Sequence, residues 1–166
     1  MTNNTLLRVE HLKKYFPVRK GIFSSFASST KRSYVRAVDD ISFTLQEEEI
    51  LGFVGESGCG KSTMSRAILR LTEPTDGNVF FRDREIISLG KKAFKAYRAK
   101  LQMIFQDPFG SLNPRRTVAD TLYQTIKVHK LADSKSRVAS LIQKTLEEVV
   151  LKPADQFWDK YPALLS

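Results

Sequence analysis

Residues 50–63 read Ile50-Leu-Gly-Phe-Val-Gly-Glu-Ser-Gly-Cys-Gly-Lys-Ser-Thr63, and this stretch decides the fold. Its second part has the pattern Gly-x-x-x-x-Gly-Lys-Ser of a phosphate-binding loop. The apolar residues 50–54 before the loop predict a buried strand of a parallel sheet. After the loop, apolar residues recur at helical spacing, at Met64, Ala67, Ile68 and Leu71. A strand, a glycine-rich turn and a helix in this order predict an α/β fold.

The residue types of this loop suit the binding of phosphate. Its glycines allow a tight turn and the close approach of a ligand to the backbone. The N–H groups of residues 57–62 can then converge on phosphate oxygens, at the positive end of the helix that follows. Lys61 can hold the β- and γ-phosphates, and the Ser62 hydroxyl suits Mg²⁺. A turn without a ligand is the alternative, but the complete pattern favours a nucleoside-triphosphate site, for ATP.

Composition and charge limit the other possibilities. A chain of 166 residues has the size of one domain, and it contains no apolar run of transmembrane length. Cys59 is the only cysteine, which excludes an internal disulfide and fits a reducing compartment. The net charge of +9 includes basic runs within residues 13–36 and 91–100. Because no nucleic-acid motif accompanies them, no nucleic-acid partner is predicted, and the second run is expected to be a solvated helix face.

The spacing of apolar residues also predicts the remaining elements. Alternation predicts strands over residues 6–16 and 35–45, then a hairpin of 78–81 and 85–87, and 102–105 form another short buried strand. Helical spacing predicts a helix over 91–101, with Phe94, Tyr97 and Leu101 on one face, and longer helices over 118–128 and 134–151, the latter capped by Ser134 or Ser136. Two prolines should keep residues 106–114 from being helical. The predicted organisation is a sheet with the phosphate loop over 1–105, a loop over 106–114 and a helical part over 115–166.

Several separate motifs resemble one protein family. These are the phosphate loop, Met103-Ile-Phe-Gln-Asp-Pro-Phe-Gly-Ser-Leu-Asn-Pro114, Leu12-Lys-Lys-Tyr-Phe-Pro-Val18 and Val35-Arg-Ala-Val-Asp-Asp-Ile-Ser-Phe43. Together they resemble the ATP-binding subunit of an ABC transporter, of the dipeptide/oligopeptide permease type. The resemblance implies an incomplete P-loop NTPase (ABC ATPase) fold. An N-terminal mixed sheet with the phosphate-loop helix would be followed by part of the α-helical subdomain.

The resemblance also implies the site residues and the cofactors, ATP and Mg²⁺. Phe16 falls where the family places the aromatic residue that stacks on adenine; Tyr15 is an alternative, and simple packing in the sheet is another. Gln106 follows a predicted strand and would join the Mg²⁺ shell with Ser62 or position a water. The expected nucleotide-binding residues are Phe16, Gly55, Glu56, Ser57, Gly58, Cys59, Gly60, Lys61, Ser62, Thr63 and Gln106.

The partners and location implied by the resemblance are those of a transport subunit. Transmembrane permease subunits and a second ABC ATPase subunit, identical or different, would bind the chain, and a substrate-binding protein would act indirectly. The chain would lie peripherally on the cytoplasmic face of the inner membrane. It would couple ATP binding and hydrolysis to the transport of dipeptides or oligopeptides.

The chain departs from the family pattern at its C-terminal end. Leu165-Ser166 resemble the first two residues of the family's Leu-Ser-Gly-Gly-Gln signature, and Ala163-Leu164 replace a His-Glu-type pair. The signature glycines, the acidic strand and the switch histidine are therefore expected to be absent, and no catalytic residue is assigned. The alternative function is a non-catalytic remnant that at most binds nucleotide. A small-metabolite kinase is disfavoured, because no arginine-rich lid is apparent.

Overall fold

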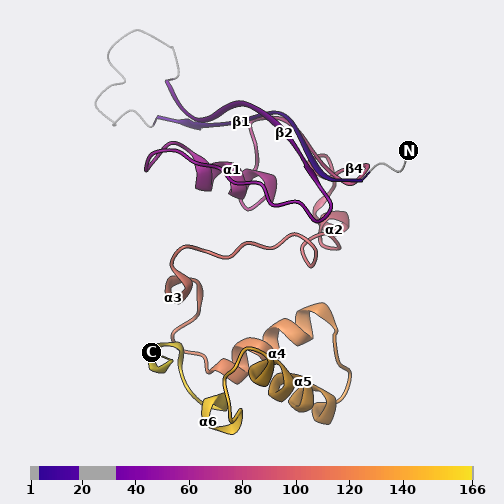
Figure 1. The fold of residues 1–166 in the computed structure, drawn as a ribbon, viewed down its shortest axis with the longest axis vertical. Coiled ribbons are helices and arrows are strands. Elements are labelled where there is room, and N and C mark those ends of the chain that lie inside the picture. The colour runs from indigo at the N-terminus through magenta and orange to yellow at the C-terminus, as the bar shows by residue number, and fades with distance from the viewer. Residues whose placement is uncertain (1–3, 19–32, 166) are drawn as a thin grey trace, which may run out of the picture. The chain divides into compact units, whose positions relative to one another are not determined.

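The computed structural model describes residues 4–18 and 33–165, which form two compact units divided between Met103 and Ile104. Residues 19–32, which belong to the basic run within residues 13–36, lie outside the described residues. The first unit contains the strands and two helices (Figure 1). Its elements are β1 (Thr5–Pro17), β2 (Tyr34–Gln46), α1 (Lys61–Ile68), β3 (Asp76–Phe81), β4 (Arg84–Glu85) and α2 (Lys91–Phe94).

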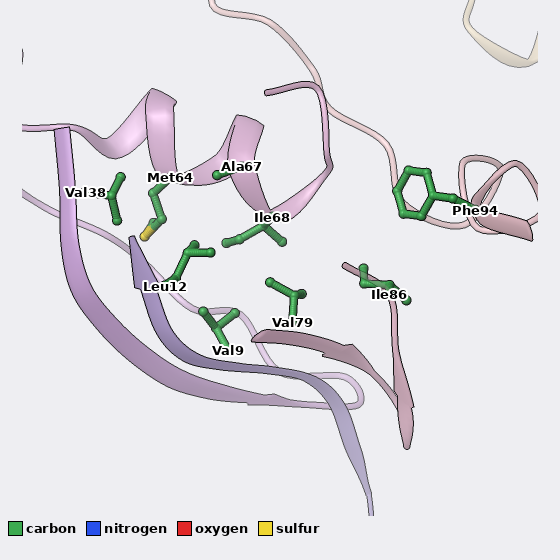
Figure 2. Close-up of a cluster of buried hydrophobic side chains, with 9 residues drawn as sticks. All are labelled: Val9, Leu12, Val38, Met64, Ala67, Ile68, Val79, Ile86 and Phe94. Carbon is green, nitrogen blue, oxygen red and sulfur yellow. The ribbon is translucent and has the colours of Figure 1, made fainter. Parts of the chain in front are cut away.

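A four-stranded sheet of order β2-β1-β3-β4 is the frame of the first unit, and all its neighbouring strands pair antiparallel. The two long predicted strands and the hairpin are confirmed, although β4 has only two residues. Alternating apolar side chains of the sheet point toward α1, and Figure 2 shows them meeting the helix. The buried cluster consists of Val9, Leu12, Val38, Met64, Ala67, Ile68, Val79, Ile86 and Phe94.

The two predicted buried strands, residues 50–54 and 102–105, do not form. A strand needs a neighbour for its N–H and C=O groups, and no described strand pairs with either segment. The described sheet is therefore antiparallel rather than mixed. Ile50, Val54 and Ile104 are consequently exposed, and only Phe53 has a ring contact, with the Phe43 ring at 4.9 Å between centroids.

Three predicted helices end earlier than expected. The one predicted over residues 134–151 ends at Glu148, because Val150 adopts φ 66°. The helix α1 stops at Ile68 and leaves Leu71 exposed, because Arg70 adopts φ 49° and donates to the carbonyls of Ile86 and Leu89, at 3.0 and 2.6 Å. The helix predicted over residues 91–101 is regular only as α2 and continues as turns. Its basic side chains repel one another at helical spacing, and no acidic residue offsets them. Its predicted apolar face still packs, with Phe94 buried and Tyr97 and Leu101 partly buried.

The second unit is helical (Figure 1). Its elements are α3 (Pro108–Ser111), α4 (Val118–His129), α5 (Lys135–Glu148), α6 (Asp155–Trp158) and the 3-10 turn Pro162–Leu164. Thr117 and Asp120 form a capping box at the start of α4. Ser134 caps α5 by accepting from the Arg137 N–H at 3.4 Å, whereas the alternative cap, Ser136, lies inside the helix. The buried residues of the second unit are Ala119, Ile126, Ile142, Leu146 and Ala154.

The expectation that residues 106–114 contain no helix is wrong at α3. Pro108 is the first residue of this single turn, where a missing N–H costs no hydrogen bond. The Asp107 carboxylate accepts from the Gly110 N–H at 3.0 Å and so stabilises the turn.

Candidate nucleotide-binding site

The phosphate loop is shaped by backbone conformations that favour glycine. Gly58 and Gly60 have φ values of 82° and 99°, in the left-handed region. A Cβ on Gly60 would overlap the carbonyl oxygen of Ala37 in β2, so the end of the loop lies directly against this strand. Across the loop, a Cβ on Gly55 would come within 2.8 Å of the Cys59 sulfur. The loop therefore closes on itself and on β2, and only small residues fit at these points.

The N-terminus of α1 offers backbone donors to an anion. Met64 makes the first bond within the helix, its N–H donating to the Gly60 carbonyl at 2.9 Å. The N–H groups of residues 61–63 have no partner among the described residues, no side chain caps the helix, and its first turn has no acidic residue. Free N–H groups together with the positive helix end favour the binding of phosphate.

Lys61 lies folded over the loop. Its ammonium group donates to the carbonyls of Gly55 and Glu56, at 2.6 and 2.8 Å, and lies 3.4 Å from the Cys59 sulfur. A phosphate must therefore replace at least one of these contacts to gain the full charge of the ammonium. Ser62 is exposed, and its hydroxyl has no hydrogen-bond partner in the described part of the chain, so it is available to a metal ion.

The two neighbouring aromatic candidates, Tyr15 and Phe16, differ in whether their side chains already bind other residues. The Tyr15 hydroxyl donates to the Asp39 carboxylate, and the Arg36 guanidinium lies 5.5 Å from the ring centroid. This hydrogen bond raises the pKa of Tyr15 and lowers the pKa of Asp39. Phe16 makes no such bonds and is 40% exposed. The geometry therefore favours Phe16 over Tyr15 as a surface for a base.

Gln106 belongs to the second unit, where it is exposed and directly precedes the cap of α3. The loop that follows it is held by local bonds. One is the Asn113 side-chain oxygen accepting from the Arg115 N–H at 3.0 Å. The structure thus brings together the predicted residues of the phosphate loop, whereas the meeting of Gln106 with Ser62 stays a prediction.

Other features of the described residues do not compete with the phosphate loop as a nucleotide site. A cavity of about 660 Å³ lies between α4 and α5, but its lining includes none of the predicted nucleotide-binding residues. Within the described ranges, no group of three His, Cys, Asp or Glu side chains could hold a metal ion. None of the described helices has the length and apolar character needed to cross a membrane.

The comparisons with known proteins decide the family. A family model described as "ABC transporter" matches residues 38–166. The chain belongs to the ABC transporter family. The resemblance seen in the sequence motifs is confirmed. Since the P-loop NTPase fold of the ABC ATPase type is that of the family, the predicted fold class is confirmed with it.

Relatives within the ABC transporter family agree with the peptide-transport subgroup. The chain is 41% identical over 159 residues to the oligopeptide transport ATP-binding protein AppF of Bacillus subtilis, covering 95% of this chain and 46% of that protein. It is 35% identical over 164 residues to the dipeptide transport ATP-binding protein DppF of Haemophilus influenzae, covering 99% and 47%. The chain therefore spans about half the length of these relatives.

A solved structure shares the fold. It is a dimeric ATP-binding cassette in a post-hydrolysis state, bound to ADP and Pi, and it matches with a TM-score of 0.71. The match covers 96% of this chain and 63% of that chain, at 22% sequence identity. At this identity the likeness shows the fold alone.

Sequence reasoning missed two groups that contact predicted site residues. One is the backbone of Ala37, which Gly60 touches; no side-chain pattern signals such a contact. The other is Lys14, whose ammonium lies 4.9 Å from the centroid of the Phe16 ring. The sequence could have indicated this contact, because Lys14 and Phe16 are two residues apart on a predicted strand and such residues share one face of the sheet.

Proposed function

We propose that this chain is the ATP-binding part of an ABC transporter that moves dipeptides or oligopeptides. The observation that carries the proposal is the N-terminus of α1, which no side chain caps and which directly follows the glycine-rich loop. The Lys61 ammonium lies on this loop, bonded to the carbonyls of Gly55 and Glu56. The names of the relatives, oligopeptide and dipeptide transport ATP-binding proteins, support the substrate class.

Each predicted residue has a role in this proposal. The N–H groups of the loop and of α1 bind the phosphates, and Lys61 adds a full charge to the β- and γ-phosphates. Ser62 and Gln106 supply oxygen ligands to Mg²⁺, which neutralises phosphate charge when it is bound. The exposed ring of Phe16 stacks on adenine.

The proposed partners follow from the same family. Transmembrane permease subunits bind the chain at the cytoplasmic face of the membrane, where it lies peripherally, and a second ABC ATPase subunit pairs with it. A substrate-binding protein acts indirectly, through the permease. The transport names of the relatives and the dimeric state of the similar solved cassette support these partners.

A titration with a fluorescent ATP analogue in the presence of Mg²⁺ tests the nucleotide site. Lys61→Ala removes the ammonium beside the loop, and we expect it to weaken binding by about tenfold or more, since hydrogen bonds to charged groups contribute about 1.5–3 kcal/mol. Lys91→Ala removes the same charge from an exposed basic run and should leave the affinity unchanged. Equal losses in the two variants would indicate nonspecific attraction to a basic chain and contradict the proposal.

A further inference from the structure

We propose that Lys14 is a positioning residue that holds the Phe16 ring ready for the adenine base. This inference rests on the proposed nucleotide site and adds a residue to it. Lys14 lies in the last third of β1 and is partly buried, and Phe16, two residues later, is exposed near the end of the strand. The Lys14 ammonium is 4.9 Å from the centroid of the Phe16 ring, within the range of a cation–π contact.

Lys14 is itself held in place. Its ammonium donates to the carbonyl oxygen of Glu73, in the turn after α1, at 2.7 Å. The cation is thus fixed by a second contact, and a fixed cation restricts the ring that it touches. Because a ring already held in one orientation loses less freedom when a ligand stacks on it, this contact favours binding. The ammonium covers only part of the ring, and Phe16 as a whole stays 40% exposed, so a base can reach it.

A β-bulge places the strand segment of these two residues opposite the part of β2 that touches the phosphate loop. Lys14 pairs with Val38, but the next residue of β1 pairs with Arg36, so Ala37 is the extra residue of β2. The carbonyl of Ala37 is the group that Gly60 touches at the end of the loop. Val38 is buried against α1, and its partner Lys14 reaches the turn after that helix. Lys14 and Phe16 therefore belong to the segment of β1 that pairs with the loop-contacting part of β2.

The test compares the affinity of the full chain for ATP with its affinity for inorganic tripolyphosphate, which has the phosphates but no base. We expect Lys14→Met to weaken ATP binding by about two- to fivefold, the size of an exposed cation–π contact, and to leave tripolyphosphate binding unchanged. Lys14→Arg should restore ATP binding, because a guanidinium can make both contacts. After Phe16→Leu, Lys14→Met should have no further effect.

Lys13→Met is the matched control. It removes the same charge one residue away, but Lys13 pairs with Asp76 at 3.6 Å and contacts no ring of the described residues. An unchanged ATP affinity in Lys14→Met overturns the inference, and so do equal losses for tripolyphosphate or an equal effect of Lys13→Met. In these three cases the wild-type chain still binds ATP, and the proposed function stands. A wild-type chain that binds neither ligand contradicts the proposed function as well.

Discussion

Gly60 lies so close to Ala37 that a Cβ on the glycine would overlap the carbonyl oxygen of the alanine. This contact joins the last glycine of the phosphate loop to the bulge in β2. It places the start of α1 against the sheet, and the N–H groups at the helix start then point to one side of the loop. The sheet thus fixes the position of the phosphate site through the backbone.

A series of glycine substitutions tests this contact. Gly60→Ala meets both a backbone clash and a φ of 99°, and it should destabilise the chain by more than about 2 kcal/mol. Gly58→Ala has the φ of 82° but open space, and should cost about 1 kcal/mol. Gly90→Ala has open space and a negative φ, so it serves as the neutral control. Urea unfolding measures all three, and equal effects of Gly58→Ala and Gly60→Ala would show that Ala37 is not in the way.

The hydrogen bond between Tyr15 and Asp39 should make stability depend on pH in two ranges. The bond lowers the pKa of Asp39, so its stabilisation is present above the ordinary carboxyl pKa of about 4 and is lost as pH falls through the lowered value. The bond raises the pKa of Tyr15, so the stabilisation is present below about pH 10 and is lost as pH rises through the raised value.

Ultraviolet titration of the tyrosines checks the alkaline range. Tyr15→Phe should remove an ionisation that occurs at higher pH than that of an ordinary tyrosine, because the pKa of Tyr15 is raised. Asp39→Asn removes the carboxylate that accepts the bond, and should shift this ionisation to lower pH. If the titration curve is the same with and without Asp39, the two side chains are not bonded in solution.

The exposed apolar segments should contribute to aggregation and not to stability. Ile50→Thr and Val54→Thr change fully exposed side chains, and unfolding free energies should stay within about 0.5 kcal/mol. The variants should also stay in solution at higher concentration, because they reduce an exposed apolar patch. Leu12→Ala, in the buried cluster, should cost about 2–5 kcal/mol. A loss from Ile50→Thr as large as that from Leu12→Ala would mean that the segment is packed.

We expect the isolated chain to bind ATP without hydrolysing it above background. The loop provides backbone N–H groups, the Lys61 ammonium and the Ser62 hydroxyl, which hold phosphates and a metal ion. None of the chain's residues is assigned to activate the attacking water, and such a group contributes several orders of magnitude to the rate of phosphoryl transfer. A phosphate-release assay with Mg²⁺ measures this, and release that disappears in Lys61→Ala would show that the chain is active.

Local patterns in the sequence predicted much of the structure. The alternation of β1 and β2, the cap at Ser134 and the glycines of the phosphate loop are each determined by neighbouring residues. Features that depend on distant residues were not predictable in this way. Residues 50–54 have the composition of a strand, but no described strand pairs with them. The contact of Lys14 with Glu73 joins residues far apart in the sequence, and no periodic pattern reveals it.

The central claim is that ATP binds at the loop before α1. Backbone amide shifts of the isotope-labelled chain, recorded by NMR during addition of Mg²⁺ and ATP, test it most directly. We predict the largest shifts at residues 57–63, which include the free N–H groups of residues 61–63, and their loss in Lys61→Ala. Shifts confined to the exposed basic run of residues 91–100, or no saturable shift at residues 57–63, would contradict the account.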